Sequence, residues 1–131
     1  MLHQSHFLGA VCGIEQVLCE IDNPVRLLVD EGYFRFVQPR TKVGFVLTVV
    51  EDTEDGPRLR GLTTGTDREC FRWAAELSKQ VNLTRVDKPL DRCVVYLDPR
   101  EFSSTWLGNK SIYRTRKAMA DGGELIVLAP A

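Results

Sequence analysis

The chain has 131 residues, and its 17 Lys and Arg nearly balance its 18 Asp and Glu, which leaves a formal net charge of −1. This length predicts one domain over residues 1–131, with an N-terminal segment, 1–20, that no motif assigns. Because positive charge is not in excess, no overall field attracts nucleic acid. No apolar run approaches the ~20 residues of a membrane-spanning helix, and the N-terminus lacks the pattern of a signal peptide. We therefore expect a cytoplasmic protein with neither a nucleic-acid nor a membrane partner.

The cysteines and histidines give no pattern typical of a metal or redox site. The four cysteines, none of them in a C-x-x-C pair, are Cys12, Cys19, Cys70 and Cys93. We interpret them as small hydrophobic side chains in a reduced compartment. His3 and His6 form an H-x-x-H pair, but no carboxylate or cysteine follows at a matching spacing, so we expect no metal ligands here.

The first half of the chain is expected to contain a helix and a β-hairpin. Asn23 as a cap and Pro24 at the first helical position predict a helix over 24–31, with Gly32 as its end. Residues 33–37 alternate in polarity, which leaves a short strand or a loop open. The β-branched run 43–50 and the segment 58–63 predict two strands joined by an acidic turn.

The second half alternates strands with helices. Thr66 and Glu69 have the spacing of a capping box, and the helix behind them places a core stripe on Cys70, Phe71, Ala74, Leu77 and Val81. Further along the chain we expect a strand over 92–97, a loop over 100–109, a helix over 111–121 and a strand over 124–128.

This order predicts the α/β class, with a mixed β-sheet and flanking helices. The terminal strand–helix–strand unit implies parallel strands with a right-handed crossover. Gly122 and Gly123 are expected to end the helix of that unit.

One face of the predicted 111–121 helix carries a phenol and several cations. At 100° per residue, Lys110, Tyr113, Arg114 and Lys117 lie on one side, near a helix N-terminus that itself favours anions. Arg can bind a carboxylate with two hydrogen bonds, Lys adds a point charge and Tyr donates a hydrogen bond. The alternative is a solvated helix face without a ligand. We find no Ser-His-Asp set and no complete Walker A motif, so no catalytic residue is predicted.

The stretch 109–130, NKSIYRTRKAMADGGELIVLAP, resembles the second domain of the nickel-dependent lactate racemase family. The similar features are a Tyr-x-x-x-Lys helix, a glycine pair and an apolar strand. Upstream, the Asn-Pro-Val helix start, the strand–turn–strand and the following helix extend the resemblance over roughly 20–130. Tyr113 and Lys117 match the family's tyrosine and lysine, which help to hold the substrate carboxylate. Arg114 stands where lactate racemase has glutamine.

The resemblance implies a substrate-facing domain of a 2-hydroxyacid racemase or epimerase. Family members use a nickel-pincer nucleotide, held largely by an N-terminal domain together with the acid/base histidines. No segment of this chain matches that domain, so the resemblance implies that the chain binds no cofactor alone and is inactive without such a partner. Two alternatives remain open: a non-enzymatic binding or dimerisation module that keeps the fold, and a small anion-binding enzyme that uses only the Lys110–Lys117 face.

Overall fold

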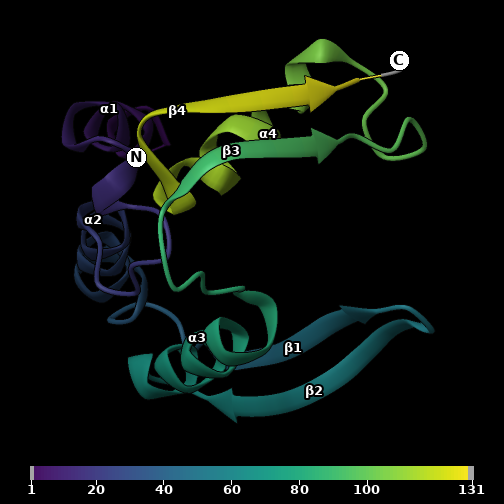
Figure 1. Ribbon diagram of the computed structural model, residues 1–131. Helices are drawn as coiled ribbons and strands as arrows, with labels where there is room; N and C mark the ends of the chain where they lie inside the picture. Colours follow the sequence, from purple (N-terminus) through teal and green to yellow (C-terminus); the bar gives the residue numbers. More distant parts are fainter. Residues whose placement is uncertain (1, 130–131) are drawn as a thin grey trace. The chain divides into compact units, whose positions relative to one another are not determined.

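The chain divides into two compact parts, Met1–Leu83 and Thr84–Ala131, here called unit 1 and unit 2. The structure is a computed structural model that describes residues 2–129, with side chains from residue 5 onward except at Thr105. Each unit is described by itself (Figure 1). The elements are α1 (Leu2–Cys12), η1 (Ile14–Gln16), α2 (Pro24–Gly32), η2 (Tyr33–Val37), β1 (Phe45–Thr53), β2 (Gly56–Gly65), α3 (Arg68–Asn82), β3 (Leu90–Tyr96), α4 (Thr105–Thr115), η3 (Arg116–Ala118) and β4 (Met119–Leu128).

The expected α/β class and the order strand, strand, helix, strand, helix, strand are confirmed. The strands form two separate two-stranded sheets rather than one. In unit 1, β1 and β2 pair antiparallel, and in unit 2, β3 and β4 pair parallel. Among the described residues, no helix is both long and apolar enough to cross a membrane.

The start of α2 is as predicted, but its end is not. The Asn23 side chain accepts a hydrogen bond from the Arg26 backbone N–H at 2.9 Å, and Pro24 occupies the first helical position. Gly32 does not end the helical path, because its φ of −62° and ψ of −40° are helical. The chain continues into the π-helical turn η2, where a strand or loop was expected. The Tyr33 ring packs against Phe34 and Phe45, with ring centroids 5.2 and 5.6 Å apart.

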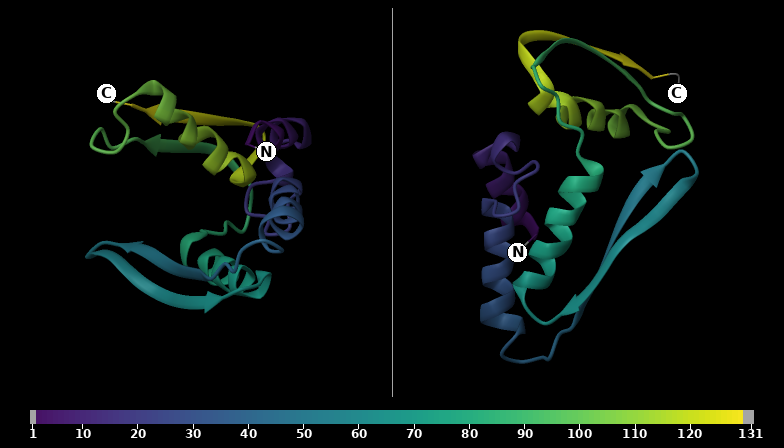
Figure 2. Two further views of the ribbon diagram at one scale, coloured as in Figure 1. Left: turned by 180° about the vertical axis from the view of Figure 1, so that it is seen from behind. Right: turned by 60° about the horizontal axis from the view of Figure 1, so that its bottom comes forward.

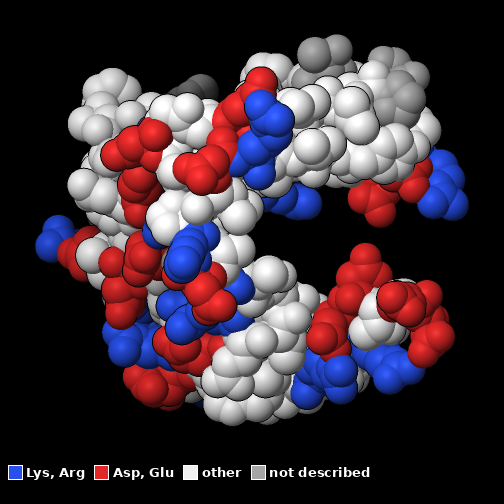
Figure 3. All heavy atoms as spheres, in the orientation of Figure 1, with Lys and Arg blue, Asp and Glu red and all other residues white. Residues whose placement is uncertain are grey.

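The hairpin of unit 1 forms with the expected acidic tip. Thr53 pairs with Gly56 at the turn, where Gly56 has a φ of 105° that side chains rarely adopt. Figure 3 shows acidic and basic side chains intermingled at this tip. Arg58 lies 2.8 Å from Asp55, so part of the negative charge is balanced locally.

Helix α3 covers one face of the hairpin, and Figure 2 shows the two side by side. Its cap is Asp67, which accepts from the Glu69 backbone N–H at 3.0 Å, so the predicted capping box of Thr66 and Glu69 is wrong. The predicted core stripe is partly confirmed, because Cys70 and Ala74 are buried together with Val49 of β1.

Glycine allows α3 to lie close to β2. A Cβ at Gly61 would lie 2.5 Å from Leu77 and 2.7 Å from the Trp73 ring. The absence of a side chain at Gly61 therefore sets the distance between the helix and the strand.

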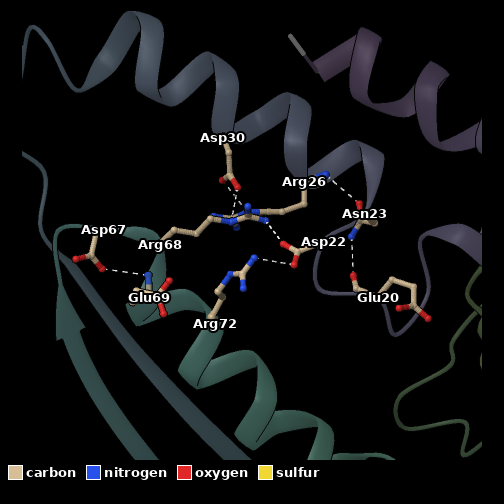
Figure 4. A network of polar contacts seen from close by, with 9 residues as sticks. All are labelled: Glu20, Asp22, Asn23, Arg26, Asp30, Asp67, Arg68, Glu69 and Arg72. Carbon is tan, nitrogen blue, oxygen red and sulfur yellow. Dashed lines mark hydrogen bonds and ion pairs between the residues drawn. The ribbon is translucent and has the colours of Figure 1, made fainter.

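A buried carboxylate joins α2 to α3. Asp30, 7% exposed, lies with one oxygen 2.8 Å from Arg26 Nε and with the other 2.8 Å from Arg68 Nε. Figure 4 shows this cluster and its extension through Asp22, which pairs with Arg68 and with Arg72. The two contacts to Asp30 are ion pairs without hydrogen-bond alignment.

The helix of unit 2 begins and ends earlier than predicted. It spans Thr105–Thr115, with Ser104 as the cap, and continues into η3. The predicted helix over 111–121 is therefore confirmed only over 111–118, since 119–121 belong to β4, and the predicted loop over 100–109 is wrong from 105 onward. Gly122 and Gly123 do not end a helix but lie within β4. Leu90 pairs with Met119 and Arg92 with Glu124, so β4 carries extra residues in an irregular bulge. Gly122 has a φ of 75° there, and a Cβ on Gly123 would lie 3.0 Å from the Leu90 carbonyl oxygen, which explains the glycine pair.

We expect Asp30→Ala to lower the free energy of unfolding by about 3 kcal/mol, because it leaves two partly buried arginines without their shared counter-ion. The matched control is Glu31→Ala. Glu31 is the neighbouring residue, its ion pair with Arg35 is largely exposed, and its loss is expected to cost less than ~0.5 kcal/mol. Urea unfolding followed by Trp73 fluorescence, with Trp106→Phe in every sample, measures both effects. Equal losses in the two variants would contradict the role given to Asp30.

Candidate functional site

Lys110 and Tyr113 lie on the same side of α4 and line one open hollow on its surface. The hollow has a volume of about 460 Å³. Its lining residues are Trp106, Leu107, Asn109, Lys110, Ile112 and Tyr113, and together they are called the α4 hollow. Lys110 is half-buried, whereas Trp106 is 80% exposed. The arrangement therefore places an ammonium, a phenol and an amide beside apolar side chains.

Arg114 and Lys117 are not part of this lining. Arg114 is exposed in the last turn of α4, and Lys117 lies beyond the helix, in η3. The sequence placed all four residues on one helix. The structure brings Lys110 and Tyr113 together and leaves the other two outside the hollow.

The position at which α4 starts rules out a contribution of its N-terminus to the predicted anion site. Since the helix begins at Thr105, the cations Lys110 and Arg114 lie in its middle and last turn rather than at its first turn. The Ser104 side chain accepts from the Leu107 backbone N–H at 3.4 Å, so the N-terminus is capped within the chain. The helix N-terminus therefore adds nothing to anion binding here, and any such binding depends on the side chains.

Two hydroxyls of α4 serve the helix itself. Ser111, 4% exposed, donates to the Gly108 carbonyl oxygen at 2.6 Å. Thr115 donates to the Ser111 carbonyl oxygen at 2.7 Å. Both hydroxyls are satisfied within the helix, so neither has the free geometry of a nucleophile.

Directly after β3, Asp98 and Arg100 form an ion pair that was not predicted from the sequence. The Asp98 carboxylate accepts hydrogen bonds from the Arg100 guanidinium, with Nη2 at 2.5 Å, and from the Arg100 backbone N–H at 2.9 Å. These bonds, the side-chain ones first, lower the pKa of Asp98 from 3.8 to about 2. The signal for the contact was the Asp-Pro-Arg sequence, in which Pro99 enforces a turn that folds Arg100 back.

Unit 1 contains a second cavity that no sequence motif indicated. It has a volume of about 220 Å³ and is lined by aromatic rings of η2, β1 and α3, beside the Asp30 cluster. The rings belong to Tyr33, Phe34, Phe45 and Phe71. Arg26 lies over the Phe71 ring at 3.7 Å, and its Nε is paired with Asp30. With Arg26 and Arg68 engaged by Asp30, this cavity offers mainly apolar surface.

The expectations about metals and cysteines have separate outcomes. The side chain of His3 lies outside the described side chains, so the H-x-x-H pair has no structural description. Cys70 is buried and the other three cysteines are half-buried, all as free thiols, in agreement with small hydrophobic side chains. Among the side chains that the structure describes, no three His, Cys, Asp or Glu residues gather as a metal site.

Comparison with known proteins adds no relative. No protein-family model matches the sequence, and neither a curated protein nor a solved structure matches it. The resemblance to lactate racemases therefore rests on the motifs alone.

We expect the Asp98 carboxyl to titrate near pH 2 and Arg100→Gln to return its pKa toward 3.8. A folded-state pKa below the unfolded value means that the contact stabilises the fold above about pH 4 and that this contribution disappears as pH falls toward 2. Carbon-13 NMR of the side-chain carboxyls measures the titration. Glu101→Gln, which keeps Arg100, serves as the control and should leave Asp98 low. A wild-type Asp98 that titrates near 3.8 would contradict the contact.

Proposed function

We propose that this chain is the substrate-facing domain of a nickel-pincer-nucleotide-dependent 2-hydroxyacid racemase or epimerase. The single observation that carries the proposal is the α4 hollow, in which Lys110 and Tyr113 lie beside Asn109 and an apolar wall. A 2-hydroxy acid offers a carboxylate, a hydroxyl and a short apolar group. The hollow offers a partner for each of these.

Each side chain of the hollow has a distinct task in this proposal. The Lys110 ammonium pairs with the substrate carboxylate, and the Tyr113 hydroxyl donates a hydrogen bond to it. The Asn109 amide can accept from or donate to the 2-hydroxyl group. Trp106 and Ile112, both exposed, supply apolar surface for the substituent. Arg114 and Lys117 add positive potential beside the hollow rather than direct contacts.

In this proposal an N-terminal partner domain holds the nickel nucleotide, as the resemblance implies. The described side chains of this chain include no group of three His, Cys, Asp or Glu that could hold a metal ion. No step of the reaction is assigned to residues of this chain. Its contribution is to bind and orient the substrate carboxylate.

A non-enzymatic binding or dimerisation module is the second candidate. Large apolar side chains remain exposed on the sheets of both units, among them Val46 and Leu59 in unit 1 and Val94 and Tyr96 in unit 2. Apolar surface of this kind is typical of interaction sites. A module of this kind would bind partners through those surfaces without any 2-hydroxy acid.

We expect lactate to bind weakly to the wild-type chain and about tenfold more weakly to Lys110→Ala and Tyr113→Phe, because each variant loses a hydrogen bond to a charged group. NMR shift titration of the full chain measures the dissociation constants. Lys79→Ala is the matched control, since Lys79 is also a half-buried helix lysine but lies on α3. Unchanged affinity in Lys110→Ala would remove the support for this site.

Activity is expected only when the full chain is combined with a nickel-nucleotide-loaded N-terminal domain of the lactate racemase family. Chiral chromatography of lactate after mixing measures racemisation, and Lys110→Ala should slow it about tenfold at subsaturating lactate. The N-terminal domain alone is the control. Racemisation that is absent from the mixture, or that does not depend on Lys110, would favour the non-enzymatic module.

A further inference from the structure

The parallel sheet of unit 2 has one covered face and one exposed face. Side chains alternate along each strand, so Cys93, Val95 and Leu97 point toward α4, and Leu97 is 5% exposed. Figures 1 and 2 show α4 on one side of β3 and β4 only. The opposite side, called the bare face, consists of Arg92, Val94 and Tyr96 on β3 and Glu124, Ile126 and Leu128 on β4.

The bare face is apolar except at one end. Val94 and Tyr96 are 57% and 63% exposed, and Ile126 and Leu128 are 38% and 49% exposed. Figure 3 shows a largely uncharged surface over these strands, with charged side chains gathered at the two ends. Parallel sheets occur almost only with both faces covered, because their strands are apolar on both sides. The bare face is therefore a candidate interaction surface.

The register of the strands makes this face complementary to itself. Arg92 pairs with Glu124, Val94 with Ile126 and Tyr96 with Leu128. Consider a second copy placed face to face by a two-fold axis that runs parallel to the strands and midway between them. Each β3 then lies over β4 of the other copy, at the same level along the axis.

This operation brings opposite charges and apolar side chains together. Arg92 of each copy lies over Glu124 of the other, and Tyr96 lies over Leu128 of the other. Within one chain, Arg92 and Glu124 already form an ion pair at 2.5 Å, so the dimer would carry four alternating charges at one end of the interface. The face has no net charge, and hence two copies do not repel each other.

We propose that the bare face is a homodimer interface with this two-fold arrangement. The four apolar side chains supply on the order of 400 Å² per copy, as large as the main apolar patch of a typical monomer. Stable interfaces bury about 800 Å² per partner. We therefore expect a weak dimer, which associates only at high protein concentration. This inference does not rest on the proposed function.

The first test is analytical ultracentrifugation of the full chain at roughly 10 to 500 µM. Wild type is expected to dimerise, and Val94→Lys to weaken association at least about tenfold by placing two ammonium groups in the apolar centre. Val86→Lys is the matched control, because Val86 is also an exposed valine of unit 2, 43% exposed, but lies in the loop before β3 rather than on the bare face. A wild type that stays monomeric at the highest concentration, or equal losses in both variants, would overturn the proposal.

The second test exchanges the charges between copies. Arg92→Glu and Glu124→Arg each place like charges opposite one another across the two-fold axis, so each variant alone should associate less than wild type. An equimolar mixture of the two variants should recover association, because the first chain then carries only acidic and the second only basic groups at this end. Loss of the pair within one chain cannot be repaired by mixing. A mixture that associates no better than its components would therefore refute the interface even if the variants are destabilised.

A binding measurement separates this proposal from the function proposed for α4. Lys110 lies on the helix that covers the other face, so Val94→Lys should bind lactate with the wild-type affinity. Loss of dimerisation with normal lactate binding supports the interface alone. Dimerisation without lactate binding supports the interface while the proposed function fails.

Discussion

Parallel pairing of β3 and β4 is the constraint on which unit 2 depends. Two parallel strands cannot be joined by a tight turn, so the chain must return along the whole sheet between them. Helix α4 provides that return and packs on one face. The position of the helix then decides two further features. It places the α4 hollow on the covered side of the sheet, and it leaves the other face without cover from the described residues of the unit.

Unit 1 has a small core, and ion pairs between α2 and α3 add to it. Its hairpin needs only the turn at Gly56, and α3 covers one face of it. Helix α2 reaches α3 through Asp30, whose two oxygens each face one arginine. Arg26 also lies over the Phe71 ring, so its stem and guanidinium act as packing surface as well as charge. A carboxylate shared in this way favours one approach of the two helices, because Asp30 contacts an arginine of each.

Local patterns predicted the elements whose signals were hydrophobic and contiguous. The β-branched run of β1, the stripe of α3 and the parallel strands of unit 2 all followed from such patterns. The glycine pair led to a wrong prediction of the helix end. Gly122 and Gly123 form a bulge in β4 that faces Leu90, a residue distant in sequence, so no local pattern could indicate it. That error moved the helix by several residues and placed Trp106 in a loop. The prediction that Lys110 and Tyr113 lie on one helix face still held, since residues three apart share a face on any helix.

The two surfaces of unit 2 can act independently because the sheet separates them. A dimer formed through the bare face would keep each α4 on the outside of the four-stranded sandwich, with both α4 hollows pointing away from the two-fold axis. Substrate binding at Lys110 and association at Val94 then share no side chain. Coupling between two sites requires that the ligand of one site bind the two states of the other with different affinity. Val94 and Lys110 lie on opposite sides of this sheet and share no lining residue, so we expect each α4 hollow to bind its ligand with the same affinity in the monomer and in the dimer.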